Sequence, residues 1–305
     1  MNIASRGKLL IISLLIVLCC IHSAQAQRNY TDYHNRILSI EECNSRESFD
    51  SSIVLYSEVF SKYDRVMARD AFNACQIGAL QKSEAFYNFF LRCAQSGITI
   101  KSLLGNALIN TQYRVDSVRC IRLYQEGYAD YMARIDTALR SEMIERAALE
   151  QRNKGNEKYA GICSDNFNRI IELCSKGQFP GEDLIGNSED IENIIFPTLC
   201  HYPYSFVKLE SCLNEAVKNG SLTPLSLVYL YGFNQTRKSV LYTNDIANDT
   251  IHFNIIYNIP FGLQSYDFSE VNMQRRLRGI FTMEVQERLR KLRAKYGVDY
   301  LMGYY

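Results

Sequence analysis

Apolar residues recur at three- and four-residue intervals along most of this chain, the spacing that places them on one face of an α-helix. Only 5 prolines and 16 glycines interrupt its 305 residues, so few positions break a helix. One segment differs: between Ile251 and Ile259 apolar and polar residues alternate, which is typical of a strand. The pattern therefore predicts a mainly all-α protein with at most one short strand or hairpin.

The first half of the pattern predicts a layer of helical hairpins. One apolar face runs from Tyr63 to Gly78, and its small residues would let a neighbouring helix approach closely. Ser83 is a suitable N-cap for the next helix, which should end before Gly97. Further helices are expected over residues 100–109 and 115–146.

A polar, charged stretch over residues 146–158 interrupts the apolar pattern and contains Asn153, Gly155 and Asn156. Segments of this composition often connect domains. We therefore expect a helical domain over residues 27–145, a linker over 146–158 and a second helical domain over 159–305.

The N-terminus has the pattern of a secretory signal peptide. Arg6 and Lys8 precede the apolar run Leu9–Ile21, and Ala26 completes a small-residue cleavage site. The run is shorter than the roughly 20 residues that span a bilayer, and no later segment has that length, so no transmembrane anchor is expected. Cleavage between Ala26 and Gln27 would deliver the protein to the periplasm or the extracellular space.

Charge argues against a nucleic-acid partner. Without residues 1–26 the chain loses two of its 34 Lys and Arg residues and none of its 33 acids, so its formal charge becomes 34 − 2 − 33 = −1. Nucleic-acid binding requires a strongly positive surface.

Loss of Cys19 and Cys20 also leaves eight of ten cysteines, which can be core thiols or disulfides. They are Cys43, Cys75, Cys93, Cys120, Cys163, Cys174, Cys200 and Cys212.

Two parts of the chain resemble known families. The hairpin from Asp70 to Gly97, with Phe72-Asn73-Ala74-Cys75 and Ala85-Phe86, resembles one unit of a tetratricopeptide-type repeat. A broader resemblance, from Lys158 to Leu292, is to a bacterial domain family of unknown function that occurs in exported proteins. It follows the order of short motifs that begin at Asp165, Gly177, Ile185, His201, Gly220, Val271 and Arg275. The resemblance implies a helical domain and brings no reaction with it.

Candidate chemistry centres on His201, which lies between Pro197 and Pro203. An imidazole there can act as a general base, or it can be a hydrogen-bonded structural residue at a helix end. Asp165 and Asn168 stand one turn apart at a predicted helix start, where they can face a polar ligand or complement the helix dipole. Arg275 and Arg276 can hold a carboxylate or phosphate, or can lie on a solvated face.

No metal site or cofactor is expected, because the histidines His34, His201 and His252 lack companion ligands at metal-site spacing. The familiar hydrolase, phosphate-loop and metalloprotease motifs are also missing from the sequence.

The C-terminal region predicts a basic amphipathic helix. Val285, Leu289, Leu292 and Tyr296 form its apolar stripe. Such a helix can touch an anionic membrane surface through Arg288, Lys291 and Lys295, or it can simply pack on the protein.

Two functions are consistent with these features. The first, which requires fewer special residues, is an interaction module that binds a protein or peptide of the cell envelope on a helical face. The second is a hydrolase-like enzyme in which His201 is the general base, Asp165 orients it and Arg275 or Arg276 holds an anionic group.

Overall fold

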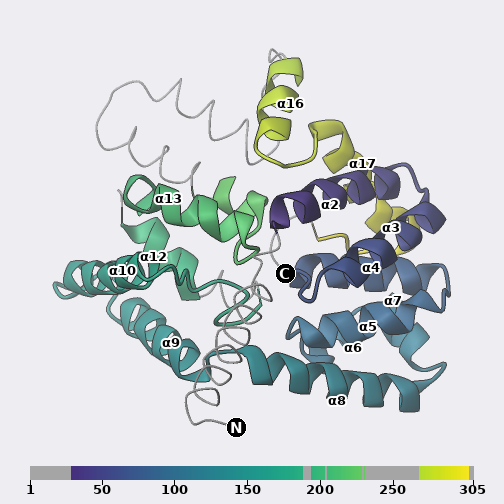
Figure 1. Ribbon diagram of the computed structural model, residues 1–305, viewed down its shortest axis with the longest axis horizontal. Coiled ribbons are helices and arrows are strands. Elements are labelled where there is room, and N and C mark those ends of the chain that lie inside the picture. The colour runs from purple at the N-terminus through teal and green to yellow at the C-terminus, as the bar shows by residue number, and fades with distance from the viewer. Residues whose placement is uncertain (1–28, 188–193, 203–204, 229, 231–267, 302–305) are drawn as a thin grey trace, which may run out of the picture.

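The computed structural model describes residues 29–187, 194–202, 205–228, 230 and 268–301 (Figure 1). These residues form helices joined by turns, and no strand occurs among them, which confirms the all-α prediction. The expected strand over 251–259 and the leader with its cleavage site at Ala26 and Gln27 lie outside the described residues. No helix in the described part of the chain is long and apolar enough to cross a membrane.

The first half is a stack of antiparallel helices. They are α2 (Tyr30–Ser45), α3 (Phe49–Lys62), α4 (Ala68–Leu80), α5 (Ala85–Gln95), α6 (Ile100–Gly105), α7 (Ala107–Tyr113) and α8 (Ser117–Arg134). Figure 1 shows them layered along one side of the molecule, with α5 between α4 and α8. A core rich in aromatic rings, including Tyr56, Phe60 and Phe89, fills the layer.

Helices α4 and α5 form the expected hairpin. The turn begins at Ser83, whose hydroxyl accepts a hydrogen bond from the Ala85 N–H at 3.2 Å. A Cβ atom on Gly78 would lie 3.1 Å from the Phe86 Cα atom, so a glycine here permits the close crossing of the two helices. The first helix starts later than the apolar face predicted. The Met67 N–H donates to the Tyr33 hydroxyl at 3.1 Å, and Met67 is extended, so α4 begins only at Ala68.

The second half begins with a break that the periodicity did not predict. Ile135 is extended, and the Asp136 carboxylate accepts from the Leu139 N–H at 2.9 Å, which starts α9 (Thr137–Arg152). The expected single helix over 115–146 is therefore two helices. Residues 146–152, the first part of the expected linker, are the last turns of α9, and Ala147 is buried in the second core.

The second core is built by α9 with three further helices, α10 (Tyr159–Ser175), α12 (Phe196–His201) and α13 (Ser205–Lys218). Phe167, Ile170 and Leu213 are buried at its centre. A disulfide between Cys174 and Cys212 joins α10 to α13. The other six cysteines that the structure describes are outside disulfides, so both arrangements left open by the sequence occur.

The chain returns to the first half through α16 (Phe268–Leu277) and α17 (Met283–Tyr296). Figure 1 shows α17 beside α2 and α3, and Val285, Leu289 and Leu292 are buried there. The apolar stripe is thus covered by protein, and α17 is a packing helix. Of its basic residues Arg288 bonds Ser45, Lys291 pairs with Glu287, and Lys295 pairs with Glu47. The stripe is therefore not available to insert into a membrane surface.

Candidate functional site at His201

His201 ends the short helix α12 and meets a buried carboxylate from α9. Its Nδ1 atom lies 2.5 Å from Oε1 of Glu150. The Glu150 side chain is fully buried, whereas 17% of the His201 side chain is exposed. The pair thus joins a carboxylate inside the core to an imidazole that reaches solvent.

The other oxygen of Glu150 is also hydrogen-bonded. Its Oε2 atom accepts from Nδ2 of Asn166 on α10 and from Oγ1 of Thr198 on α12, both at 2.9 Å. Both oxygens are therefore engaged by donors from α10 and α12, which fixes the carboxylate in place. When Glu150 is ionised it only accepts hydrogen bonds, and the proton at the contact is then carried by His201 Nδ1. Nε2 is then the nitrogen with the lone pair.

Cys163 is the third group of this cluster. One donor atom each from Glu150, Cys163 and His201 can be chosen so that all lie within 4.8 Å of one another. Cys163 is on α10, one turn before Asn166, and is 6% exposed. The Tyr159 ring packs edge-on against the imidazole at 5.7 Å between ring centres. We refer to Glu150, Cys163 and His201 as the His201 site.

Carboxylate, thiol and imidazole are all zinc ligands, but the distances within the set differ from those of a zinc site. Two ligands on one tetrahedral zinc, each about 2.0 Å from the ion, are about 3.3 Å apart. The Glu150–His201 contact is only 2.5 Å, a hydrogen-bond distance. A closed structural site would also need a fourth donor, and three are grouped here among the described residues. The arrangement fits an acid–base pair better than a zinc cage.

The other residues predicted for the site lie elsewhere. Asp165 and Asn168 are exposed on α10, because the buried face of that helix is occupied by Cys163, Asn166 and neighbouring apolar residues. Glu150 therefore takes the orienting position that the sequence assigned to Asp165.

The two arginines are also separate from His201. Arg275 is buried at the junction of α16 and α17, where it donates to the Phe281 carbonyl at 2.7 Å and to Oε1 of Gln286 at 2.6 Å. Burial lowers the pKa of Arg275 to about 10. Arg276 is exposed on the same helix. Figure 1 shows α16 and α12 in different parts of the molecule, so the predicted grouping with His201 is not formed.

Sequence reasoning missed Glu150 because it was assigned to the linker. A signal was nevertheless present, since Leu139, Met143, Ala147 and Glu150 follow one another at helical spacing and are all buried. A carboxylate that continues an apolar stripe must find a partner in the core. Extending the helix by two turns would have placed Glu150 on the buried face.

A second set of buried charges lies between α2 and α4, and we call Glu41, Arg69 and Asp70 the Arg69 cluster. The guanidinium lies 3.3 Å from Glu41 Oε1 and 2.8 Å from Asp70 Oδ1. Tyr33 donates its hydroxyl proton to Asp70 at 2.8 Å. Burial raises the pKa of Glu41 to about 7, although Arg69 acts in the opposite direction.

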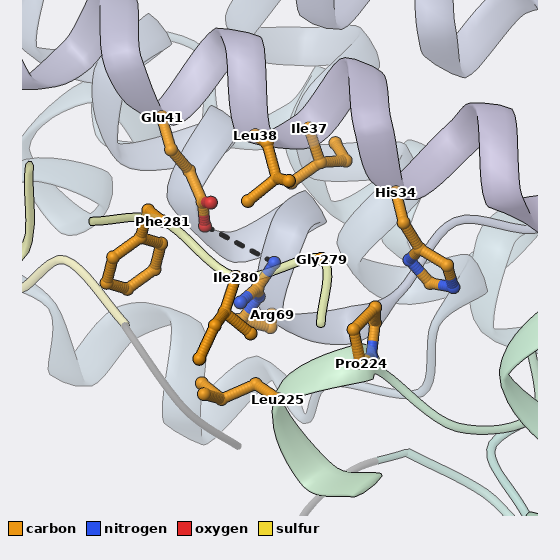
Figure 2. Close-up of a pocket in the computed structure, with 10 residues that line it drawn as sticks. All are labelled: His34, Ile37, Leu38, Glu41, Arg69, Pro224, Leu225, Gly279, Ile280 and Phe281. Carbon is orange, nitrogen blue, oxygen red and sulfur yellow. Dashed lines mark ion pairs between the residues drawn. The ribbon is translucent and has the colours of Figure 1, made fainter. Parts of the chain in front are cut away.

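Figure 2 shows that the cavity beside the Arg69 cluster is lined by residues from four parts of the chain. Its volume is about 10 Å³, roughly the space that one water requires. His34 lies at its edge, bonded through Nε2 to the Val217 carbonyl at 3.1 Å, and burial lowers the pKa of His34 to about 4. The Arg69 cluster therefore has a structural role, since it links α2 to α4, and the cavity beside it is too small for a ligand.

Comparison with known protein families, curated proteins and solved structures finds no match to this chain. The resemblances to a repeat unit and to an uncharacterised family therefore stay predictions.

Proposed function

We propose that the protein is a hydrolytic enzyme in which His201 acts as the general base, and Glu150 orients it and stabilises the imidazolium that forms when it takes a proton. The observation that carries this proposal is the contact between a fully buried carboxylate and a partly exposed imidazole. A buried carboxylate is costly unless it is paired. Here the partner is an imidazole, the side chain that most often serves as a general base.

The expected chemistry follows from the tautomer. Nε2 of His201 takes a proton from the attacking group as that group adds to an electrophilic carbonyl. Glu150 stabilises the imidazolium that forms, and Asn166 and Thr198 hold the carboxylate in line. The proton then passes to the leaving group. General base catalysis of this kind contributes roughly 10²- to 10⁴-fold in rate.

An exported location belongs to the same proposal. It is supported by the predicted leader with cleavage between Ala26 and Gln27, and by the Cys174–Cys212 disulfide. Disulfides persist mainly in oxidising compartments. An envelope or extracellular ester or amide is therefore the substrate class to test.

The test is hydrolysis of p-nitrophenyl acetate and of a panel of longer acyl esters and peptides. We expect His201→Ala to lose about 100-fold or more in kcat/KM, and Glu150→Gln to lose about 10-fold. Asp165→Asn is the matched control on α10, and it should retain the parent rate. Equal rates in the parent and in His201→Ala would overturn the proposal.

A second candidate, binding of an envelope protein or peptide, is favoured by a different observation. The outward face of α8 and the turn before it carry exposed apolar residues: Val115 is 69% exposed and Val118 80%, and Ile121 and Met132 are exposed on the same helix. Exposed apolar residues on one helix can mark an interaction surface. The measurement is cross-linking in intact cells, with Val118→Asp expected to lose the cross-linked partner and Val54→Asp, on α3, expected to keep it.

A further inference from the structure

We infer that Cys163 is the nucleophile of the His201 site and that the substrate is an acyl compound, namely an ester, thioester or amide, which passes its acyl group to the thiol. This inference rests on the proposed function, because it requires His201 as the base. It adds the bond that forms and the intermediate that should accumulate.

The placement of the thiol is the first reason. Cys163 lies in the same 4.8 Å group as the carboxylate and the imidazole, although the three residues come from three different helices. Nδ1 of His201 is engaged by Glu150. The inference therefore assigns the thiol proton to Nε2, the ring nitrogen that Glu150 does not engage. Nucleophile, base and orienting carboxylate are the three roles that activated cysteines need.

The second reason is the contrast with three buried cysteines of the first half. Cys75, Cys93 and Cys120 are buried in the aromatic core of the first half, and a hydrogen bond links Cys75 to Cys93. Burial raises the pKa of Cys120 to about 11. These are inert core thiols. Cys163 differs because it stands beside an imidazole that reaches solvent.

The reaction balances with the residues present and one water. The thiol of Cys163 gives its proton to Nε2 of His201, and the sulfur forms a bond to the carbonyl carbon. The leaving alcohol, thiol or amine departs with that proton, which leaves an acyl thioester on Cys163. Water then gives a proton to His201 and adds to the thioester. The C–S bond breaks, and the proton returns to the sulfur.

The experiment measures alkylation of each cysteine by iodoacetamide, resolved by peptide mass spectrometry, between pH 6 and pH 8.5. When the pH is lowered from 8.5 to 6, the alkylation rate of an ordinary thiol falls about 100-fold, because its thiolate fraction falls. We expect Cys163 to slow less than 10-fold and to react faster at pH 6 than Cys43, which is the more exposed internal control. His201→Gln should return Cys163 to ordinary behaviour and leave Cys43 unchanged.

Hydrolysis assays separate this inference from the function on which it rests. Cys163→Ala should abolish turnover and the +42 Da acetyl adduct that p-nitrophenyl acetate leaves on the parent. If Cys163→Ala keeps the parent rate while His201→Ala loses it, His201 activates water directly and the inference fails alone. If both keep it, both proposals fail. If Cys163 reacts only after a chelator removes a stoichiometric metal ion, the site is a metal site and the inference is overturned. Unchanged unfolding midpoints in the variants guard against misfolding.

Discussion

Glu41 and Glu150 are both buried carboxylates, yet their partners differ in charge and in access to solvent. Glu41 faces Arg69, which is itself buried and remains charged at any physiological pH, beside a cavity of about 10 Å³. Glu150 faces His201, an imidazole that is 17% exposed. Burial of a charge therefore does not by itself indicate a functional site. What distinguishes the two carboxylates is whether the partner side chain reaches solvent and whether it can accept a proton.

The largest expected effect concerns the Arg69 cluster. Arg69→Met removes the cation between Glu41 and Asp70, and a buried pair broken on one side costs about 3–5 kcal/mol. Urea unfolding at pH 7 measures the loss. Glu41→Gln, which keeps the shape and removes the charge, should cost about 1 kcal/mol or less. If Arg69→Met lowers the free energy of unfolding by less than about 1 kcal/mol, the Arg69 cluster does not stabilise the fold.

The next effect concerns the disulfide, which is present in the second core and absent from the described part of the first. The described cysteines of the first half form no disulfide, whereas Cys174 and Cys212 are joined across a sequence separation of 38 residues. Replacing both by serine should lower the free energy of unfolding by about 3 kcal/mol. A reductant should lower the thermal midpoint of the parent and leave that of the double variant unchanged. Equal sensitivity in the two proteins would contradict the pairing.

The third effect is a dependence of the free energy of unfolding on pH, caused by the buried carboxyl groups of Glu41 and Glu182. Burial raises the pKa values of Glu41 and Glu182 to about 7, above the value near 4.5 for an unfolded chain. The native state thus binds more protons between about pH 4.5 and 7, so stability falls as pH rises through that window. The loss is at most about 3 kcal/mol per carboxyl.

Unfolding in urea at pH 5 and pH 8 tests this dependence. His34, with its pKa lowered to about 4, acts in the opposite sense between about pH 4 and 6.5, so the difference between variant and parent is the informative quantity. Glu41→Gln and Glu182→Gln should each flatten the decline. If the free energy of unfolding falls between pH 5 and pH 8 as steeply in both variants as in the parent, other groups cause the pH dependence.

The smallest effect distinguishes the two arginines that the sequence could not separate. Arg275→Met leaves the Phe281 carbonyl and Gln286 without their donor and should cost about 2 kcal/mol. Arg276→Ala, on the exposed side of α16, should stay within about 0.5 kcal/mol. Thermal unfolding of the two variants side by side is sufficient, and similar losses would argue against the buried role of Arg275.

Local patterns predicted the helices well where neighbouring residues decide the outcome. The α4–α5 hairpin, the Ser83 turn and the buried stripe of α17 follow from spacing and turn chemistry. Helix boundaries differ from the expectation at Met67 and Ile135, at Asn106, where the helix expected over 100–109 is divided into α6 and α7, and at the end of α9. At Met67 a distant tyrosine hydroxyl takes the backbone N–H, and at Ile135 the backbone is extended before a new cap at Asp136. Periodicity cannot detect such contacts, because they come from outside the helix or act at single residues.

The sequence by itself determined that this chain is helical, that α17 is amphipathic and that His201 is the histidine to examine. Only the tertiary structure decided that its partner is Glu150 and that Asp165 faces solvent. The physical reason is that a residue one position away on a helix points about 100° away, so small errors in helix boundaries reassign every side chain. Glu150, Cys163 and His201 are separated along the chain and meet only because three helices pack around one carboxylate.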